Sequence, residues 1–462
     1  MSDYQLIVIG AGPGGYVAAL KAAKLGLKVA VVENREAGGT CLNRGCIPTK
    51  TMLHSSHLYH SMMTGKEAGV TAGDVKVDIE AIYARKRAVS AQLSSGIEGM
   101  FKSAKVDLLR GKGMIMDSHT VKVTAADGEE KTYTADDILA ATGSVPARPP
   151  IPGLDLPGVM TSDELLEGAD HLFKSIVIIG GGVIGVEFAT FYSDLGCEVT
   201  IVEGLDRLIP NLDRELGQNL AQILKKRGVK IYTSAMVQSV AQGDGCMNVN
   251  FVSKDVPGVA SGEVVLCAIG RTPYTEGLFA PGLQPEMNRR SIKVDERYQT
   301  SIPHVYAIGD VSARIQLAHV ASAQGTACVE MLCGREPEVN MNIVPSCIYA
   351  RPEIAAVGMT DAEAKDAGIA VKVGKYVMFG NGRTVIEGAD RSFMKVVARA
   401  DDHCIVGAQL MCERSTDMIS QIAQAIANNM TVEQLLRAMR PHPTFEEGMM
   451  ECLEDLVDKL NK

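Results

Sequence analysis

The sequence predicts an α/β protein with two dinucleotide-binding modules, because one pattern of strand, glycine-rich loop, helix and strand occurs twice. Residues 6–33 and 176–203 match this pattern at a constant offset of 170 positions. In each copy an apolar strand leads into a GxGxxG loop that opens a helix, and an acidic residue ends the second strand. A single GxGxxG is weak evidence, but its repetition in the same context indicates two Rossmann-like modules in one chain.

The length and composition leave room for a further domain beside the two modules. The chain has 462 residues, of which 46% are hydrophobic, and the usual size of domains suggests about three of them. Lysine and arginine total 46 against 55 aspartates and glutamates, and no long basic run occurs. This balance disfavours a nucleic-acid partner and suits small-molecule chemistry.

The start of the chain and its cysteines indicate a cellular setting. MSDYQLIVIG enters an apolar strand almost at once, without the regions of a signal peptide, and no apolar stretch reaches membrane-spanning length. The 11 cysteines are an odd number without regular spacing, unlike a secreted disulfide framework. We therefore expect a cytoplasmic protein with mostly reduced thiols and no membrane association.

The glycines of each loop have separate tasks in such a module. The first permits the tight turn, the second lets a pyrophosphate approach the backbone, and the third lets helix and strand pack closely. The phosphates then lie at the positive end of the helix. These glycines are Gly10, Gly12 and Gly15 in the first copy and Gly180, Gly182 and Gly185 in the second.

The acidic residues that end the second strands predict the type of nucleotide. Glu33 and Glu203 each follow the first glycine of their loop by 23 positions, where a carboxylate accepts hydrogen bonds from a ribose diol. A 2′-phosphate would be repelled by Glu203, so the second module should prefer NAD to NADP. Arg207 could soften that preference, or it could be a solvated loop arginine. Two dinucleotide sites in one chain are most economically explained by FAD and NAD.

A pair of cysteines just after the first module predicts redox chemistry. In GGTCLNRGCIPTK, residues 38–50, Cys41 and Cys46 are five positions apart. That separation in an unbroken helix is about 7.5 Å, beyond the usual limit for a disulfide. The segment must therefore be distorted to close a bridge, which Gly45 makes easier.

So small a disulfide loop stabilises a protein weakly, which makes reversible redox use more plausible than a structural bridge. Two packed, reduced cysteines remain an alternative on spacing alone. A metal site is disfavoured because CLNRGC lacks the usual ligand spacing and a matching second pair.

Together these segments resemble the flavin-dependent pyridine nucleotide-disulfide oxidoreductases over the whole chain, and most closely the dihydrolipoamide dehydrogenases. GGTCLNRGCIPTK resembles the redox-disulfide motif of that family, which lies in its FAD domain. LAATGSVP at 139–146 and LCAIGRTP at 266–273 resemble the strands on which the chain leaves its nucleotide modules. TSIPHVYAIGD at 300–310 resembles the second FAD motif, and HPTFEE at 442–447 resembles the catalytic His–Glu segment.

The resemblance implies a domain order and an assembly. It places an FAD-binding domain with the redox disulfide at 1–146, an NAD-binding domain at 147–272, a central segment returning to the FAD domain at 273–342, and a C-terminal α+β dimerisation domain at 343–462. The last domain would form a homodimer. Partners would be the lipoyl-bearing proteins of 2-oxoacid dehydrogenase complexes or of the glycine cleavage system.

The resemblance also implies the cofactor residues. Lys50 would lie near the flavin and pair with Glu187, where a cation stabilises reduced flavin and lowers thiol pKa values. The other residues expected to contact FAD, beyond the first glycine loop and Glu33, are Thr40, Gly113, Thr142, Gly143, Ser144, Asp310, Leu317, Ala318 and His319. The residues expected to contact NAD, beyond the second glycine loop and Glu203, are Val237 and Gly270.

Four residues would carry the catalysis. The resemblance assigns dithiol exchange to Cys41 and contact with the flavin to Cys46. It makes His442 a general acid/base that serves the partner subunit, with Glu447 orienting its ring, because a dithiol reacts as thiolate and an imidazole can take its proton. The implied reaction is oxidation of protein-bound dihydrolipoamide with reduction of NAD.

Two departures from the pattern concern the substrate. Arg440 stands where these enzymes usually have a second histidine, and Tyr274 stands where the GRTP echo is usually followed by asparagine. An NADH-dependent reductase of another low-molecular-weight disulfide therefore remains an alternative. A non-catalytic flavoprotein subunit of a complex is a further one, which the four catalytic residues oppose.

Overall fold

The computed structural model describes residues 2–312, 315–389 and 391–462, and it contains the predicted duplication. The first copy forms β1 (Tyr4–Ile9), α1 (Pro13–Lys24) and β2 (Val29–Glu33). The second forms β9 (Ser175–Ile179), α6 (Val183–Asp194) and β10 (Glu198–Val202). In both copies the two strands pair in parallel around a connecting helix, so the predicted α/β class is confirmed.

The first module is a sheet in the order β3-β2-β1-β6-β5-β4, with β19 beside β6. Its other strands are β3 (Asp107–Arg110), β4 (Lys112–Ile115), β5 (Thr120–Thr124), β6 (Glu130–Ala140) and β19 (Val305–Ala307). The helices α4 (Ile79–Ala104) and α8 (Ala318–Leu332) belong to this module. A Cβ at Gly325 of α8 would lie about 2.5 Å from the Gly14 carbonyl oxygen, so glycine allows α1 and α8 to pack closely.

The second module has a parallel sheet in the order β11-β10-β9-β15-β8 and a small antiparallel sheet. The added parallel strands are β8 (Val159–Thr161), β11 (Lys230–Tyr232) and β15 (Val264–Cys267). The antiparallel strands are β12 (Ala235–Gln242), β13 (Met247–Ser253) and β14 (Val256–Gly262). Its helices besides α6 are α5 (Ser162–Glu167) and α7 (Arg214–Lys226).

The chain passes between the modules at two short strands that pair with each other. β7 (Ser144–Pro146) and β16 (Arg271–Pro273) are antiparallel, with Ser144 opposite Pro273. They lie in the two segments, 139–146 and 266–273, that were expected to leave the modules. After β16 the chain makes the short pair β17 (Met287–Asn288) and β18 (Ser291–Ile292) before β19. The domain boundaries stay predictions.

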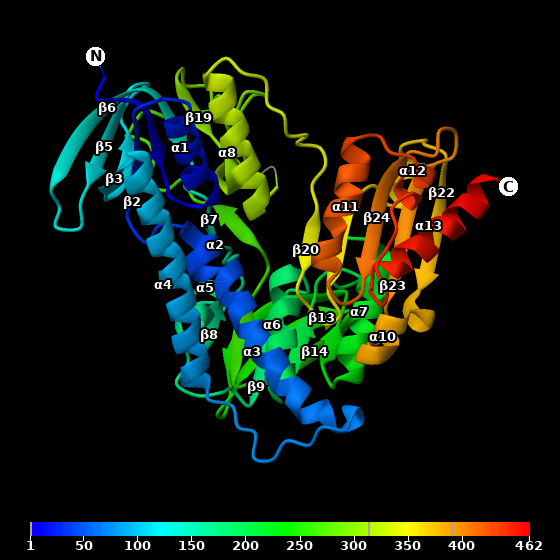
Figure 1. Ribbon diagram of the computed structural model, residues 1–462. Coiled ribbons are helices and arrows are strands. Elements are labelled where there is room, and N and C mark those ends of the chain that lie inside the picture. The colour runs from blue at the N-terminus through cyan, green and yellow to red at the C-terminus, as the bar shows by residue number, and fades with distance from the viewer. Residues whose placement is uncertain (1, 313–314, 390) are drawn as a thin grey trace.

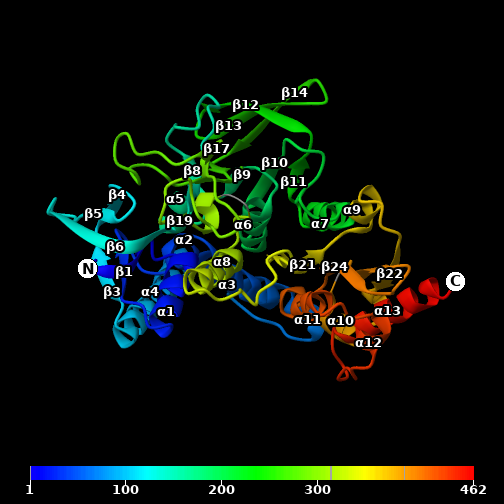
Figure 2. The same ribbon diagram turned by 90° about the horizontal axis from the view of Figure 1, so that it is seen from above.

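The C-terminal unit is an antiparallel sheet with helices, and it has a core of its own. Its sheet order is β20-β21-β24-β23-β22, and Figures 1 and 2 show it on the side of the molecule opposite β5 and β6. The strands are β20 (Ser346–Ile348), β21 (Ile354–Gly358), β22 (Val371–Val377), β23 (Phe393–Arg399) and β24 (Ile405–Met411). The helices are α9 (Asp361–Asp366), α10 (Gly382–Glu387), α11 (Ser415–Ala427), α12 (Val432–Leu436) and α13 (Glu447–Leu460).

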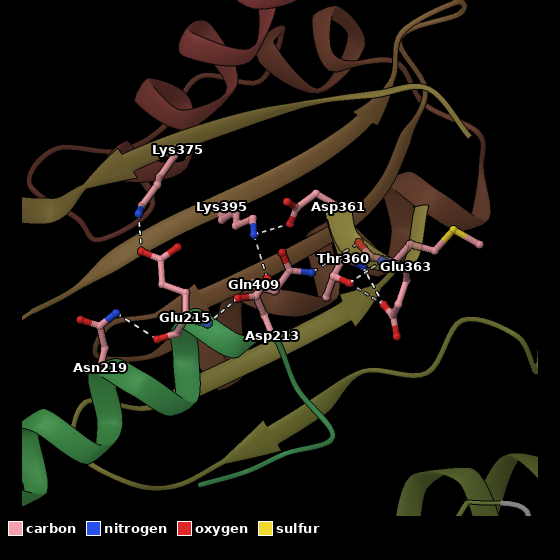
Figure 3. A network of polar contacts seen from close by, with 10 residues as sticks. Asp213, Glu215, Asn219, Thr360, Asp361, Glu363, Lys375, Lys395 and Gln409 are labelled. Carbon is pink, nitrogen blue, oxygen red and sulfur yellow. Dashed lines mark hydrogen bonds and ion pairs between the residues drawn. The ribbon is translucent and has the colours of Figure 1, made fainter. Parts of the chain in front are cut away.

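A group of ion pairs, which we call the Lys395 cluster, joins the second module to the C-terminal unit (Figure 3). Lys395 of β23 donates to Asp213 at 2.8 Å and also to Asp361, and Lys375 of β22 donates to Glu215. Asp213 is the N-cap of α7 and accepts the Glu215 amide N–H at 2.8 Å. Lys395 is 8% exposed and the Asp213 side chain is enclosed as well, so this one pair is a buried connection between the two parts. Lys375, Glu215 and Asp361 are partly exposed.

The predicted dithiol segment forms two helices that meet at Gly45. These are α2 (Gly39–Arg44) and α3 (Cys46–Thr64). α3 then lies along α6, with Lys50 opposite Glu187 and His60 opposite Asp194, so the two helices run in the same direction. No helix within the described ranges is long and apolar enough to cross a bilayer.

Candidate active site

A cavity of about 1760 Å³ extends between the two modules and reaches the first strand of the C-terminal unit. Its lining includes both cysteines of the dithiol segment and the loops of both modules. Every predicted cofactor residue lies on this lining except Gly15 and Gly185, which are buried beneath their loops. The lining members are Gly10, Gly12, Glu33, Thr40, Lys50, Gly113, Thr142, Gly143, Ser144, Gly180, Gly182, Glu187, Glu203, Val237, Gly270, Asp310, Leu317, Ala318 and His319.

The glycine loops have the shape that a dinucleotide requires. A Cβ at Gly15 or Gly185 would collide with the carbonyl oxygen of the first glycine of its own loop. By contrast, a Cβ at Gly182 would meet no protein atom within 4 Å, and one at Gly12 would meet its nearest atom only at 4.0 Å. The third glycines therefore serve packing, while the second glycines leave open backbone for a phosphate.

The two predicted ribose-binding acids also brace the loops beneath them. Glu33 accepts the amide N–H groups of Ala11 and Arg35 at 2.8 Å each. Glu203 accepts the amides at the equivalent positions of the second copy, Gly181 and Leu205. Each carboxylate oxygen holds one backbone donor and keeps lone-pair capacity for a ribose hydroxyl on the cavity side.

Arg207 is turned away from the nucleotide cavity. Its guanidinium donates to Asp206 at 3.0 Å and to the Pro210 carbonyl at 2.9 Å, and it lines a separate cavity behind the loop. Of the two alternatives for Arg207, the structure favours a loop arginine. The charge next to the ribose position is therefore the Glu203 carboxylate.

The dithiol lies across the interruption between α2 and α3. Cys41 and Cys46 are free thiols that both face the cavity. A Cβ at Gly45 would lie 3.0 Å from the Thr40 carbonyl oxygen, so glycine fits the break between the helices. The distortion that the spacing required is present at the predicted residue.

The pKa values of the two thiols are shifted in opposite directions. A hydrogen bond with Cys46 raises the pKa of Cys41, and burial raises it further. The same hydrogen bond lowers the pKa of Cys46 to about 7, against the effect of burial and with help from the Lys50 cation. Cys46 is therefore the member of the pair that carries negative charge near neutrality.

Lys50 and Glu187 form a two-oxygen ion pair between α3 and α6. The Lys50 Nζ lies 2.9 Å and 2.8 Å from the two carboxylate oxygens. Burial alone would lower the pKa of Lys50, but the Glu187 carboxylate raises it above its usual value. A permanent cation is thus held within reach of Cys46.

Asp310 is held at the cavity wall by two consecutive side-chain hydrogen bonds, from Arg271 to Ser144 and from Ser144 to Asp310, which the sequence did not indicate. It lies in the 3₁₀ turn Gly309–Ser312 that follows β19, and Ser144 Oγ donates to it at 2.5 Å. Arg271 donates to Ser144 Oγ and to the Ser144 carbonyl, at 2.8 Å each. Burial raises the pKa of Asp310. Arg271 was missed because only pairing of β7 with β16 brings it to Ser144.

His442 and Glu447 lie together but outside the cavity. His442 Nδ1 is 2.7 Å from Glu447 Oε1, in the turn before α13, and the His442 side chain is 78% exposed. Glu447 also accepts the Thr444 amide N–H at 2.8 Å, which together with His442 lowers the pKa of Glu447. The predicted pair is present, but one chain does not bring it to the dithiol.

The two departures noted in the sequence have structural roles. Arg440 donates to the carbonyls of Leu435 and Ala438, so its guanidinium folds back on the end of α12. Tyr274 takes part through its backbone: its carbonyl accepts from Thr142 Oγ1 at 2.6 Å, and its amide N–H donates to the Gly143 carbonyl at 2.9 Å. Both therefore stabilise the chain around the predicted site.

Comparison with known proteins decides the family. Residues 4–325 match the pyridine nucleotide-disulphide oxidoreductase model, and residues 344–453 match the dimerisation domain of the same proteins. The chain belongs to the pyridine nucleotide-disulphide oxidoreductase family. FAD and NAD are its cofactors, and the family's dimerisation domain makes it a homodimer.

Relatives within this family match along the whole chain. A dihydrolipoyl dehydrogenase of Bacillus subtilis is 36% identical and covers 98% of this chain and 96% of its own length. LpdA of Mycobacterium tuberculosis has a TM-score of 0.91 at 28% identity, with 98% of this chain and 99% of that chain covered. The HOCl-induced flavoprotein disulfide reductase RclA of Escherichia coli has a TM-score of 0.86 at 28% identity, with 98% and 99% covered.

Proposed function

We propose that this protein is an NAD-dependent dihydrolipoyl dehydrogenase that oxidises protein-bound dihydrolipoamide to lipoamide through Cys41 and Cys46. The observation that carries the proposal is the dithiol at the helix break, in one cavity with both glycine loops and the Lys50–Glu187 pair. Relatives of that name at full length support it. The first glycine loop, next to the dithiol, would hold FAD, and the second would hold NAD.

The dithiol accounts for the substrate half of the reaction, which starts from the disulfide form of Cys41 and Cys46. A dihydrolipoamide thiol gives its proton to the partner subunit's His442, and its thiolate attacks the Cys41 sulfur. A substrate–Cys41 bond forms, the bond to Cys46 breaks, and its electron pair leaves on Cys46. The second substrate thiol then attacks the substrate sulfur that is bound to Cys41, and its proton passes to the Cys41 thiolate that leaves. Lipoamide is released and Cys41 is left as a thiol.

The residues around Cys46 favour this direction of bond breaking. A leaving sulfur departs faster when its thiol pKa is low, and the pKa of Cys46 is lowered to about 7. The Lys50 cation stabilises the thiolate that remains. FAD held by the first glycine loop would supply the electron acceptor for this dithiol, and NAD held by the second loop would supply the final hydride acceptor.

The acid/base pair supports an active site shared between the two subunits. His442 is exposed and lies outside the cavity of its own chain, while Glu447 occupies Nδ1 and leaves Nε2 available. A second copy that presents Nε2 to the dithiol would complete the site. In this arrangement neither chain is active alone.

The substrate would be the lipoyl group of a 2-oxoacid dehydrogenase complex or of the glycine cleavage system. A cytoplasmic location remains a prediction from the cysteine pattern. Likeness to the disulfide reductase RclA favours one second candidate, NADH-dependent reduction of another disulfide.

Activity assays on the purified protein distinguish these two candidate functions. We expect rapid reduction of NAD with dihydrolipoamide, and slow oxidation of NADH with glutathione disulfide or other small disulfides. A preference for a small disulfide over lipoamide, measured as kcat/KM, would overturn the proposal in favour of the second candidate. Absence of both activities in flavin-loaded protein would leave the non-catalytic subunit as the better description.

A further inference from the structure

The C-terminal unit places one aromatic residue against the redox ion pair. Tyr349 follows β20, and its backbone amide donates to Glu187 Oε1 at 3.1 Å. Its ring lies under Lys50, with Nζ 4.7 Å from the ring centroid. All three parts of the fold therefore meet here, with Lys50 from α3, Glu187 from α6 of the second module, and Tyr349 from the C-terminal unit.

We propose that Tyr349 is a positioning residue that fixes Lys50 beside Cys46 and thereby sets the reactivity of the Cys46 thiol. The inference rests on the role of Cys46 in the proposed function and adds a residue that no sequence motif indicated. Tyr349 would act through Lys50, and it would make no contact with substrate.

The contacts explain why Lys50 needs this support. A lysine ammonium is a compact charge on a flexible chain, and it takes several positions unless its surroundings restrict it. Glu187 holds the ammonium from one side, and the Tyr349 amide holds one Glu187 oxygen in turn. The aromatic face attracts the cation from the other side. Lys50 is then confined to a position from which it stabilises the Cys46 thiolate.

Few other charged groups compete for Cys46. Within one chain, the titratable groups with the largest effect on its thiol are Cys41 from α2, Lys50 from α3 and Glu187 from α6. On the side of Tyr349, the neighbouring groups are Cys347, Glu353 and Lys50. Lys50 is the cation common to both environments, so a change at the ring reaches Cys46 through Lys50.

The chain around Tyr349 is anchored firmly enough to hold the ring in place. Two residues later, Arg351 donates to Asp194 at 2.7 Å, and Asp194 also lies 3.7 Å from His60. Asp194 ends α6, the helix that carries Glu187. The segment from Tyr349 to Arg351 is thus attached at two points along the parallel helices α3 and α6.

The test measures Cys46 directly in the reduced, flavin-loaded protein. Pulses of iodoacetamide at a series of pH values, followed by peptide mass spectrometry, give the alkylation rate of each cysteine. Tyr349→Leu removes the aromatic face and should raise the pH midpoint for Cys46 by about half a unit, slowing its alkylation at neutral pH about two- to threefold. Tyr349→Phe keeps the ring and should match the native protein.

A double-mutant cycle shows whether the effect passes through Lys50. Lys50→Met alone should raise the Cys46 midpoint, and adding Tyr349→Leu should give no further shift. The proposal fails if Tyr349→Leu leaves the midpoint unchanged, if Tyr349→Phe shifts it equally, or if the shift persists without Lys50. Tyr349→Met, which is long and non-aromatic, repeats the test if leucine impairs folding. Because alkylation requires no substrate, the expected shift without dihydrolipoamide turnover would refute the proposed function alone.

Discussion

The dithiol of Cys41 and Cys46 lies inside a cavity of its own chain, whereas the His442–Glu447 pair lies on the surface of the C-terminal unit. The dithiol is surrounded by helix ends, glycine loops and the partly buried Lys50–Glu187 ion pair, all supplied by one chain. The His442 side chain is 78% exposed and has one carboxylate to orient it. In the proposed mechanism this difference corresponds to electron transfer within a subunit and proton transfer between subunits.

The largest expected effect is the loss of dihydrolipoamide oxidation when one cysteine of the dithiol is replaced. Cys41→Ser should lower dihydrolipoamide oxidation by about 10³-fold or more, because no disulfide with Cys46 can form. Flavin absorbance and NAD binding should stay close to native values, since Cys41 supports neither glycine loop. Turnover in the Cys41→Ser protein close to that of the native enzyme would rule out the dithiol mechanism.

Mixing variant subunits should show whether His442 of one subunit acts on the dithiol of the other. His442→Gln should lower kcat by about 10²- to 10⁴-fold, the usual contribution of a general acid/base. Refolding equal amounts of this variant with Cys41→Ser should restore about a quarter of native activity, because half of the dimers then contain one intact site of two. No recovery, with mixed dimers shown by native mass spectrometry, would place both halves in the same chain.

A smaller effect is expected at the residue that orients the histidine. Glu447→Gln keeps a partner for Nδ1 but removes the charge that favours imidazolium, so kcat should fall about tenfold. Glu446→Gln serves as a neighbouring control, since Glu446 does not contact His442 in any described hydrogen bond. Equal losses in the two variants would argue against orientation by Glu447.

The smallest expected effect is a difference in alkylation rate between the two thiols in the cavity, Cys41 and Cys46. Because the pKa of Cys46 is about 7 and that of Cys41 is raised, alkylation of reduced protein should select Cys46 near neutrality. Below this pH Cys46 is protonated and its rate should fall about tenfold per pH unit, while above it the rate levels off. Preferential labelling of Cys41 near neutral pH would contradict this order of the two thiol pKa values.

The features that the sequence predicted well are those encoded by short local patterns. The glycine loops and the acids Glu33 and Glu203 could be located because each module must form its turn and its ribose contact from adjacent residues. Gly45 could be predicted as the break because the cysteine spacing does not fit an unbroken helix. The antiparallel sheet of the C-terminal unit was expected only through resemblance to a family.

The features that the sequence did not predict depend on distant parts of the chain. Arg271 reaches Ser144 only because β16 pairs with β7. Tyr349 reaches Lys50 only because β20 enters the junction of α3 and α6. Neither residue lies in a motif of its own, and no periodicity marks them. Contacts of this kind require the tertiary structure.

The Lys395 cluster has a consequence for how the protein denatures. Lys395 is 8% exposed and is neutralised from both sides, by Asp213 of the second module and by Asp361 of the C-terminal unit. Unfolding of either part alone would break the buried Lys395–Asp213 pair and take away the partner of the charge that stays in the other part. Melting of the C-terminal sheet should therefore be coupled to melting of the second module. We expect calorimetry to show fewer cooperative unfolding transitions than the number of separate sheets suggests.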